Sequence, residues 1–354
     1  MKAVLIGLPQ SGKSTVFSAI TGTALDPYAA PKPHTAVVRV SDPRLAYLAA
    51  LCQPKKVTEG TIELIDVPGC SLDEAKGRDE WRRLLPVVRE ADLLVVVVRD
   101  FDTPNVPAYR DRVDADADFN AMLEELMFAD LVGVTTRIER LEKALKKPTK
   151  THEAEKREMV LLNACREALE SERPLSSVLT TQDDRRQVAS FAFLTEKPLL
   201  GVRNVSDERA ATEETWQVPH VEETITLGAS IEAEIAMLDP QDRPAFLADA
   251  GLKAPAHDRL LPACCRAAGL ISFFTMNSEE VRAWLIPKGS TAVAAAAKIH
   301  TDIARGFIRA ETISYDELVA HKDMKGAKAA GRIRKEGKTY IVEDSDILQI
   351  LASL

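Results

Sequence analysis

The sequence predicts an α/β fold in which a mostly parallel sheet carries an inserted antiparallel helical hairpin and is followed by a small α+β domain. A short apolar strand opens the chain and runs directly into a glycine-rich loop. Apolar residues at helical spacing fill the middle of the chain, and strand-like runs surround an alanine-rich helix near its C-terminus. Strands that alternate with helices are typical of a parallel sheet, whereas the last region has the pattern of a separate α+β unit.

The composition is that of a folded protein with two or three domains, since 45% of the 354 residues are hydrophobic and 28% are charged. No apolar run approaches the roughly 20 residues that span a bilayer, and the glycine-rich loop comes too early for a signal peptide, so we expect no membrane association and a cytoplasmic location. Five cysteines without paired CxxC spacing favour neither disulfides nor a zinc site. The net charge of -8 argues against a generally cationic nucleic-acid surface but allows a local basic patch.

A phosphate-binding loop follows the first strand. Residues Lys2–Ile6 have the pattern of a buried strand, and Gly7–Thr15 read GLPQSGKST, which matches the P-loop pattern GxxxxGK[ST] of nucleotide-hydrolysing proteins. Its glycines let successive N–H groups point at phosphate oxygens. Lys13 is placed to reach the β- and γ-phosphates, Ser14 to bind Mg2+, and Thr15 to serve the α-phosphate side or to pack. The predicted nucleotide-binding residues of this loop are Leu8, Pro9, Gln10, Ser11, Gly12, Lys13, Ser14 and Thr15.

A second motif of the same site lies one strand downstream. The run TIELIDV at Thr61–Val67 is strand-like and leads into Asp66-Val67-Pro68-Gly69, a DxxG motif. This motif places a carboxylate beside Mg2+ and a glycine N–H near the γ-phosphate, which favours a switch-type NTPase over a kinase. Cys70 stands where Ras-like enzymes have a water-orienting glutamine, and we interpret it as a small buried residue, so the catalytic group stays unknown.

Two later strands lead to a base-recognition tetrad. The run Asp92–Asp100 is apolar enough to be buried on both faces of a parallel sheet. The run Lys197–Val205 ends in Asn204-Val205-Ser206-Asp207, in the place where switch GTPases carry NKxD and use the aspartate to read guanine, although valine replaces the lysine. We therefore predict that Asn204, Val205 and Asp207 bind the nucleotide.

A helical hairpin separates these two strands. The stripe Leu131, Val134, Ile138, Leu141 and Leu145 repeats at three and four residues, and a second stripe contains Leu162, Cys165 and Leu169. Two antiparallel helices explain both stripes. The sequence Lys146-Lys147-Pro148-Thr149 is expected to break the pair, and Pro174 to close the insertion.

The C-terminal region begins near Leu270. It contains the strand-like runs ISFFT, VRAWLI, Phe307–Thr312 and Thr339–Val342 and a helix predicted over Thr291–Ala304, in which we interpret His300 as structural. Residues 322–338 contain seven Lys and Arg against two acidic residues, an excess of five positive charges. Such a segment suits either RNA phosphates or an ordinary solvated surface.

Taken together, these motifs resemble the YchF or Obg-like ATPase family over nearly the whole chain. The likeness includes GLPQSGKSTVFSAIT, SDPRLAYLAAL, PKKVTEGTIELIDVPG, NVSD and ASIEAEIAML, and it is densest over Glu280–Leu348. The resemblance implies Mg2+-dependent hydrolysis of ATP in preference to GTP, without the catalytic glutamine, and adds Ala229 and Ser230 to the nucleotide site. It also implies an NTPase domain at 1–117 and 190–269, a hairpin at 118–189, and a β-grasp TGS domain at 270–354.

Several positions depart from the family pattern. Asp207 replaces a glutamate and leaves GTP as an alternative to ATP, and Ala108 occupies the place of a histidine. The family's first switch contains a threonine. Counting backward from VVRVSDPRL aligns it with Ala30, whereas counting forward from Lys13 aligns it with Thr35. Thr35 therefore joins Ser14 and Asp66 as a candidate Mg2+ ligand. The second switch has fewer glycines around Gly77, and hydrolysis is therefore expected to be slow or differently activated.

These observations predict an ATP-hydrolysing switch that couples its nucleotide state to the ribosome or a translation-related partner. The TGS domain and the basic segment 322–338 are the predicted contacts with ribosome or RNA. Two alternatives stay open, namely a GTP-binding GTPase and a nucleotide-gated binding protein with negligible turnover.

Overall fold

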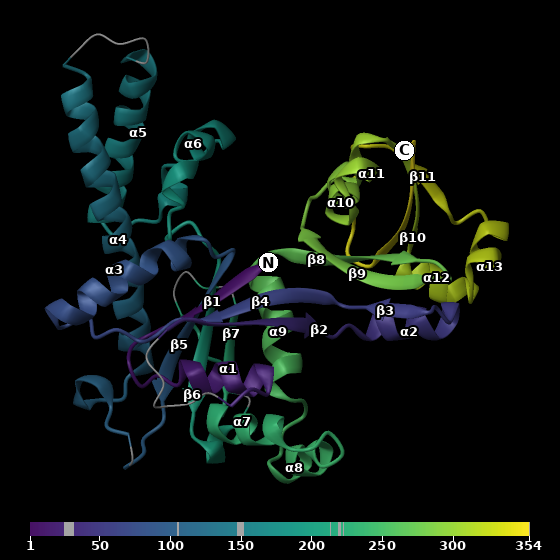
Figure 1. Cartoon of the computed structure of the whole chain (residues 1–354), viewed down its shortest axis with the longest axis horizontal. Helices are drawn as coiled ribbons and strands as arrows, with labels where there is room; N and C mark the ends of the chain where they lie inside the picture. The colour runs from purple at the N-terminus through teal and green to yellow at the C-terminus, as the bar shows by residue number, and fades with distance from the viewer. Residues whose placement is uncertain are drawn as a thin grey trace. The chain divides into compact units, whose positions relative to one another are not determined.

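The computed structural model describes residues 1–24, 32–104, 106–146, 152–212, 214–218, 221 and 223–353. By internal contacts the chain divides into two compact units, Met1–Thr35 with Leu64–Ala256, and Ala36–Glu63 with His257–Leu354 (Figure 1). Residues 36–63 and 257–269, which the sequence-based division places in the NTPase domain, thus belong to the second unit. The three-part division itself stays a prediction.

The first sheet has the strand order β2-β4-β1-β5-β6-β7. Its strands are β1 (Lys2–Ile6), β2 (His34–Val40), β4 (Gly60–Asp66), β5 (Leu93–Asp100), β6 (Leu199–Val205) and β7 (Glu223–Leu227). Neighbours from β1 through β5 and β6 to β7 pair in parallel. All residues of β5 but the last are buried, which explains its unbroken apolar sequence. The predicted parallel sheet is confirmed, whereas β2 and β7, whose residues are mostly half-buried or exposed, were not predicted.

Helices of the first unit accompany this sheet. They are α1 (Lys13–Thr21), α3 (Ala75–Arg89), α4 (Ala115–Ala144), α5 (His152–Glu170), α6 (Gln182–Gln187), α7 (Ala229–Met237) and α8 (Arg243–Asp249). Buried side chains of β1, β5, α3 and α4 form a hydrophobic core, in which Phe119 packs edge-on against Trp216. Among the described residues, no helix combines the length and the apolar character needed to span a membrane.

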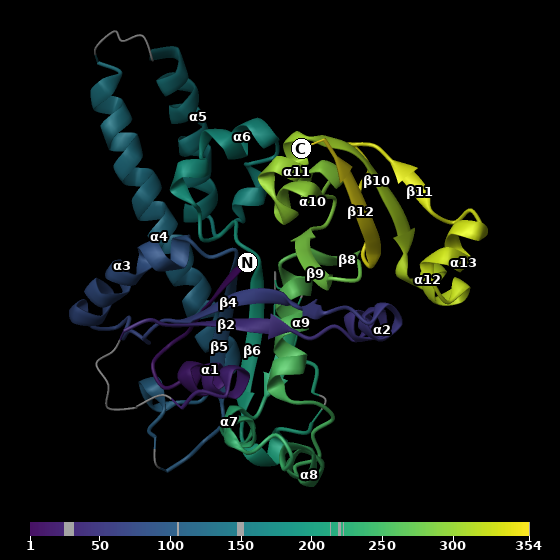
Figure 2. The same cartoon turned by 45° about the vertical axis from the view of Figure 1, so that its right-hand side comes forward.

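The predicted hairpin is formed by α4 and α5, which lie side by side in both views (Figures 1 and 2). Asp114 caps α4 by accepting a hydrogen bond from the Ala117 N–H at 3.0 Å. The predicted stripes meet in one buried cluster, where Val134 and Ile138 of α4 join Leu162 of α5. The expected break at Lys147–Thr149 lies outside the described residues.

A buried ion pair fastens the base of this hairpin to the sheet-bearing part of the unit. Asp130 of α4 is fully buried, and its Oδ1 accepts from Arg89 Nη1 of α3 at 2.8 Å. Its Oδ2 accepts from both the backbone N–H and the hydroxyl of Thr195, at 3.0 and 2.9 Å. Arg89 also donates to the carbonyls of Phe191 and Ala129. One carboxylate therefore holds three segments of the chain together.

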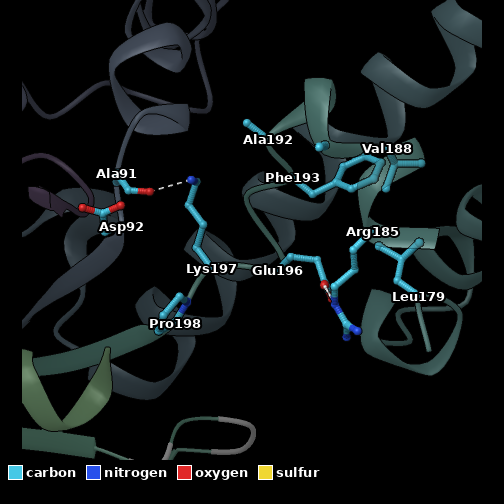
Figure 3. Close-up of a pocket in the computed structure, with 11 residues that line it drawn as sticks. Ala91, Asp92, Leu179, Arg185, Val188, Ala192, Phe193, Glu196, Lys197 and Pro198 are labelled. Atoms are coloured by element: carbon cyan, nitrogen blue, oxygen red, sulfur yellow. Dashed lines mark hydrogen bonds and ion pairs between the residues drawn. The ribbon is translucent and has the colours of Figure 1, made fainter. Parts of the chain in front are cut away.

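A pocket of about 280 Å3 lies beside this base (Figure 3). Lys197 Nζ donates to the Ala91 carbonyl at 2.6 Å, Arg185 pairs with Glu196 at 3.3 Å, and Asp92 accepts a backbone N–H at 2.7 Å. Burial lowers the pKa of Lys197. Because these charged groups already have partners, we interpret the pocket as a packing gap at the hairpin base.

The second unit is built on a sheet with the order β11-β10-β12-β8-β9-β3. Its strands are β3 (Lys56–Thr58), β8 (Leu270–Met276), β9 (Glu280–Pro287), β10 (Phe307–Ser314), β11 (Arg334–Glu336) and β12 (Asp346–Ala352). Its helices are α2 (Pro43–Cys52), α9 (Ala256–Ala267), α10 (Ala292–Ile299), α11 (Thr301–Arg305), α12 (Tyr315–His321) and α13 (Met324–Ala329). Leu45 and Leu48 of α2 pack with Phe274 and Ile313. The segment around α2 is thus part of the C-terminal core.

Two sequence-based expectations for this unit were wrong. The helix predicted over Thr291–Ala304 is interrupted at His300, whose extended backbone lets its Nδ1 accept from the Asp302 N–H at 3.2 Å and cap α11. The predicted strand Thr339–Val342 forms only an isolated bridge between Thr291 and Ile341.

We predict that Asp130→Ala lowers the free energy of unfolding by about 3–5 kcal/mol, because it leaves the half-buried Arg89 guanidinium without its carboxylate. Urea unfolding followed by tryptophan fluorescence measures this loss. The control is Asp79→Ala, which removes an exposed pair with Arg82 within α3 and should change stability by less than about 1 kcal/mol. Equal losses in the two variants would contradict a special role for Asp130.

Candidate functional site

The predicted phosphate loop connects β1 to α1, and two glycines fix its course. Gly7 has φ 154°, and a Cβ there would lie 2.3 Å from the Val97 carbonyl oxygen. Gly12 has φ 87° at the N-cap of α1, where a Cβ would lie 2.1 Å from Asn204 Nδ2. Any larger residue would collide with β5 or with the base-recognition tetrad. The two glycines of the motif are therefore required by the fold.

Lys13 lies inside this loop. Its side chain is buried, and Nζ donates to the carbonyls of Gly7 and Leu8 at 2.9 and 3.0 Å. Burial lowers the pKa of Lys13 to about 8, although the charge of Asp66 opposes this shift. The loop thus encloses an amine whose charge an incoming phosphate would stabilise.

Ser14 and Asp66 form the candidate metal site. Ser14 Oγ donates to Asp66 Oδ2 at 2.7 Å, although the two residues are 52 positions apart. Asp66 is buried, and burial raises its pKa against the opposing effects of Ser14 and Lys13. Its Oδ1 is buried and has no hydrogen-bond partner. An unpartnered carboxylate oxygen beside a hydroxyl fits a hard cation such as Mg2+.

No group of three or more His, Cys, Asp or Glu side chains among the described residues could hold a metal by itself. Mg2+ commonly binds one or two protein oxygens and completes its coordination shell with substrate phosphates and water. Thr35, the third predicted ligand, is exposed on β2, and its metal contact stays a prediction. Its neighbour His34 is close enough to act electrostatically on Asp66. Ala30 lies outside the described residues.

The DxxG glycine lies against the phosphate loop. A Cβ on Gly69 would be 2.8 Å from Lys13 Nζ and 3.0 Å from Pro9 Cα. The next residue, Cys70, is buried, and burial raises the pKa of its thiol. A neutral buried thiol neither orients water nor attacks phosphorus. The prediction that Cys70 is a small buried residue is confirmed.

The base-recognition tetrad is joined to the phosphate loop by Asn204. Its buried side chain donates to the Ser11 carbonyl at 3.1 Å and accepts from the Ala229 N–H at 3.1 Å. Asp207 Oδ1 accepts from the Ile231 N–H at 3.1 Å, in the first turn of α7. The structure therefore brings together predicted residues that lie 193 positions apart. Val205 is buried beneath them, and Ser230 is exposed on α7.

Sequence reasoning missed a polar clamp on the segment after the DxxG motif. Asp73 accepts two hydrogen bonds from Arg110, at 2.9 and 2.6 Å, and one from the Tyr109 hydroxyl. The same hydroxyl accepts from the Leu72 N–H at 3.2 Å. Arg110, followed by Tyr109, lowers the pKa of Asp73 to about 2. The clamp joins the second switch to the loop containing Ala108, and no spacing in the sequence indicated it.

Two family models match separate parts of this chain. Residues 2–124 match a family described as a 50S ribosome-binding GTPase, and residues 270–353 match YchF-GTPase_C, described as a protein of unknown function. The solved structure of the Schizosaccharomyces pombe YchF GTPase superposes with a TM-score of 0.81 at 24% identity, covering 99% of this chain and 97% of that one. This likeness confirms the predicted fold class.

Two curated relatives match at full length. The chain is 36% identical to the ribosome-binding ATPase YchF of Bacillus subtilis, over 98% of both proteins. It is 34% identical to the ribosome-binding ATPase YchF of Escherichia coli O157:H7, over 99% of this chain and 98% of the relative. Identity of this level along the whole length shows that the chain belongs to the YchF family.

Proposed function

We propose that this chain is a Mg2+-dependent nucleotide switch that binds ATP, hydrolyses it slowly and couples its nucleotide state to the ribosome. The proposal rests mainly on one observation: Lys13, Ser14 and Asp66 lie together at the phosphate loop, and the buried Oδ1 of Asp66 has no hydrogen-bond partner. The names of the curated relatives, ribosome-binding ATPases, support both the reaction and the partner.

The phosphate loop performs most of the binding. Its backbone N–H groups and the N-terminus of α1 would hold the phosphates, and Lys13 would exchange the Gly7 and Leu8 carbonyls for phosphate oxygens. Ser14 and Asp66 would hold Mg2+, which when bound supplies neutralisation of the charge on the β- and γ-phosphates. Gly69, which lies against Lys13 and Pro9, would direct its N–H at the γ-phosphate.

We expect slow turnover because neither Cys70 nor Ala108 can orient the attacking water. Water must attack the γ-phosphorus in line with the departing phosphate oxygen, and an orienting side chain normally positions it. Cys70 is buried as a neutral thiol, and Ala108 has no group that could take over the task. A nucleotide-gated binding protein with negligible turnover is the corresponding alternative.

ATP is the favoured nucleotide within this proposal, and GTP is the alternative. Reading guanine requires the Asp207 carboxylate to accept two N–H groups from the base. Its Oδ1 already accepts the Ile231 N–H, which would compete with that role. Adenine does not present this pair of donors, so the engaged carboxylate supports ATP.

The basic segment 322–338 is the proposed contact with ribosomal RNA. All seven of its lysines and arginines are exposed. Arg334 is also tied to the fold, because it lies 3.6 Å from the buried Asp346 and 3.1 Å from the Tyr340 hydroxyl. A cytoplasmic location belongs to the same proposal, since none of the five cysteines forms a disulfide, as suits a reducing compartment.

Phosphate release from MgATP over many turnovers tests the reaction. Lys13→Ala should reduce release to the background rate because the phosphates lose their buried cation. The control Lys76→Ala removes a lysine exposed on α3 and should leave the rate unchanged. Release that persists in Lys13→Ala would rule out this site, and tight MgATP binding by the wild type without release would favour the binding-protein alternative.

Calorimetric titrations with ATP in Mg2+ and in EDTA test the metal site. Asp66→Asn keeps an acceptor for Ser14 but removes the negative charge. We therefore expect the dissociation constant in EDTA divided by the dissociation constant in Mg2+ to fall at least tenfold relative to the wild type. The matched control is Asp79→Asn, which removes an exposed carboxylate from α3. Equal loss of the Mg2+ effect in both variants would contradict Asp66 as the ligand.

Cosedimentation with ribosomes at several salt concentrations tests the RNA contact. Lys325→Glu with Lys328→Glu should weaken binding and flatten its dependence on salt, because fewer counterions are released. The control is Lys298→Glu with Arg305→Glu, which changes the same number of exposed charges on α10 and α11. Unchanged binding by the first variant would place the contact elsewhere.

A further inference from the structure

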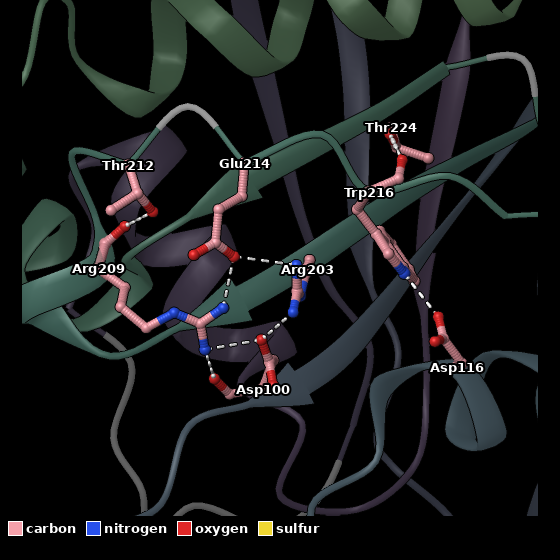
Figure 4. A network of polar contacts seen from close by, with 8 residues as sticks. All are labelled: Asp100, Asp116, Arg203, Arg209, Thr212, Glu214, Trp216 and Thr224. Carbon is pink, nitrogen blue, oxygen red and sulfur yellow. Dashed lines mark hydrogen bonds and ion pairs between the residues drawn. The ribbon is translucent and has the colours of Figure 1, made fainter.

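We propose that Arg209 is a positioning residue for base recognition, held in a closed ring of four charges that fixes the loop carrying Asp207. The inference rests on the proposed nucleotide binding and adds the residue that sets its selectivity. The ring consists of Asp100 at the end of β5, Arg203 in β6, Arg209 and Glu214 (Figure 4).

Each arginine of the ring contacts both acids. Arg203 lies 2.7 Å from Asp100 Oδ2 and 3.2 Å from Glu214 Oε2, and Arg209 lies 2.9 and 2.6 Å from the same two atoms. The contacts of Asp100 Oδ2 are charge contacts rather than well-aligned hydrogen bonds. The exposed fractions are 18% for Asp100, 21% for Arg203, 35% for Arg209 and 43% for Glu214.

A closed ring of four charges stabilises the loop more than four separate surface ion pairs would. Ordering two long side chains offsets much of the attraction in an isolated exposed pair. In the ring each side chain serves two contacts, so the entropy lost on ordering it is shared. The half-buried position of Asp100 and Arg203 also reduces screening by salt.

The ring and the nucleotide site share one strand end. Arg203 and Asn204 are consecutive in β6 and therefore point to opposite faces. Asn204 contacts Ser11 of the phosphate loop, while Arg203 enters the ring. Position 207 begins the 3-10 turn that Arg209 ends, so the ring holds that turn.

Arg209 is held at its backbone as well as at its side chain. Thr212 Oγ1 donates to the Arg209 carbonyl at 2.7 Å, and Arg209 Nη1 donates to the Asp100 carbonyl at 3.3 Å. The Asp207 carboxylate itself is exposed and is bound through Oδ1 to the Ile231 N–H in the first turn of α7. A change at Arg209 would therefore displace Asp207.

Trp216, which follows the ring in the same segment, is held by contacts of its own. A change at Arg209 should therefore have a local effect that can be measured. Trp216 Nε1 donates to Asp116 Oδ1 at 2.8 Å (Figure 4). The Trp216 ring also packs edge-on against Phe119. Loss of Arg209 leaves these contacts in place. It also leaves Asp100 and Glu214 with one arginine between them, an excess of negative charge beside the base-recognition loop.

Calorimetry of Arg209→Gln with MgATP, MgGTP and Mg-tripolyphosphate tests the proposal. We expect the ratio of the GTP and ATP dissociation constants to move at least threefold toward one, while tripolyphosphate binding stays within twofold of the wild type. Arg209→Lys keeps the charge and should restore part of the selectivity. The matched control is Arg137→Gln, which removes an arginine paired at 2.7 Å with Glu158 in the hairpin and should not change the ratio.

Selectivity that stays within twofold of the wild type in a folded Arg209→Gln variant would overturn the proposal. An equal loss of affinity for all three ligands would do the same, because it would indicate a stabilising role only. Should Arg209→Gln fail to fold, Glu214→Gln removes one side of the ring and should move the ratio in the same direction. Wild-type protein that binds neither nucleotide would instead contradict the proposed function, before any variant is compared.

Discussion

The buried amide of Asn204 is the constraint on which the geometry of the site depends. By bonding to the Ser11 carbonyl and to the Ala229 N–H, it fixes the phosphate loop, the end of β6 and the start of α7 relative to one another. Gly12 is glycine because this amide occupies the space that its side chain would need. A buried amide that used only one of its groups would be destabilising. The three segments therefore keep their places together or lose them together.

A second feature of the site is a pair of buried ionisable groups of opposite sign, Lys13 and Asp66. Lys13 is enclosed by carbonyl groups, and Asp66 keeps one oxygen without a hydrogen-bond partner. Burial acts against the charged form of both groups, lowering one pKa and raising the other. Such an arrangement stabilises a fold poorly, whereas a bound metal and triphosphate would supply the missing partners. This unfavourable burial supports the proposed role of Lys13 and Asp66 in binding the phosphates and the metal.

The sequence located the segments that the structure brings together wherever a motif is made of neighbouring residues. The phosphate loop, the DxxG motif and the Asn204 to Asp207 tetrad each have fixed spacing and a mechanism that explains it. It was insufficient where a residue's role is decided by partners far along the chain. In the sequence Arg209 resembles any surface arginine. Only the structure shows that Asp100, 109 positions away, lies beside it. The helix break at His300 was missed for another reason, since alanine propensity dominates the pattern and only the cap on Asp302 reveals the turn.

Tyr109 and Arg110 hold Asp73, and with it the segment that follows the DxxG motif, through three hydrogen bonds. A carboxyl whose folded pKa is about 2, below the unfolded value of about 3.9, contributes stability that is present above pH 4 and is lost only as pH falls through 2. Ordinary changes of pH therefore leave the clamp intact. Asp73 is nevertheless half exposed, and exposed ion pairs contribute little net stability. The clamp therefore restrains the segment after the DxxG motif across the physiological pH range while contributing little to the free energy of unfolding.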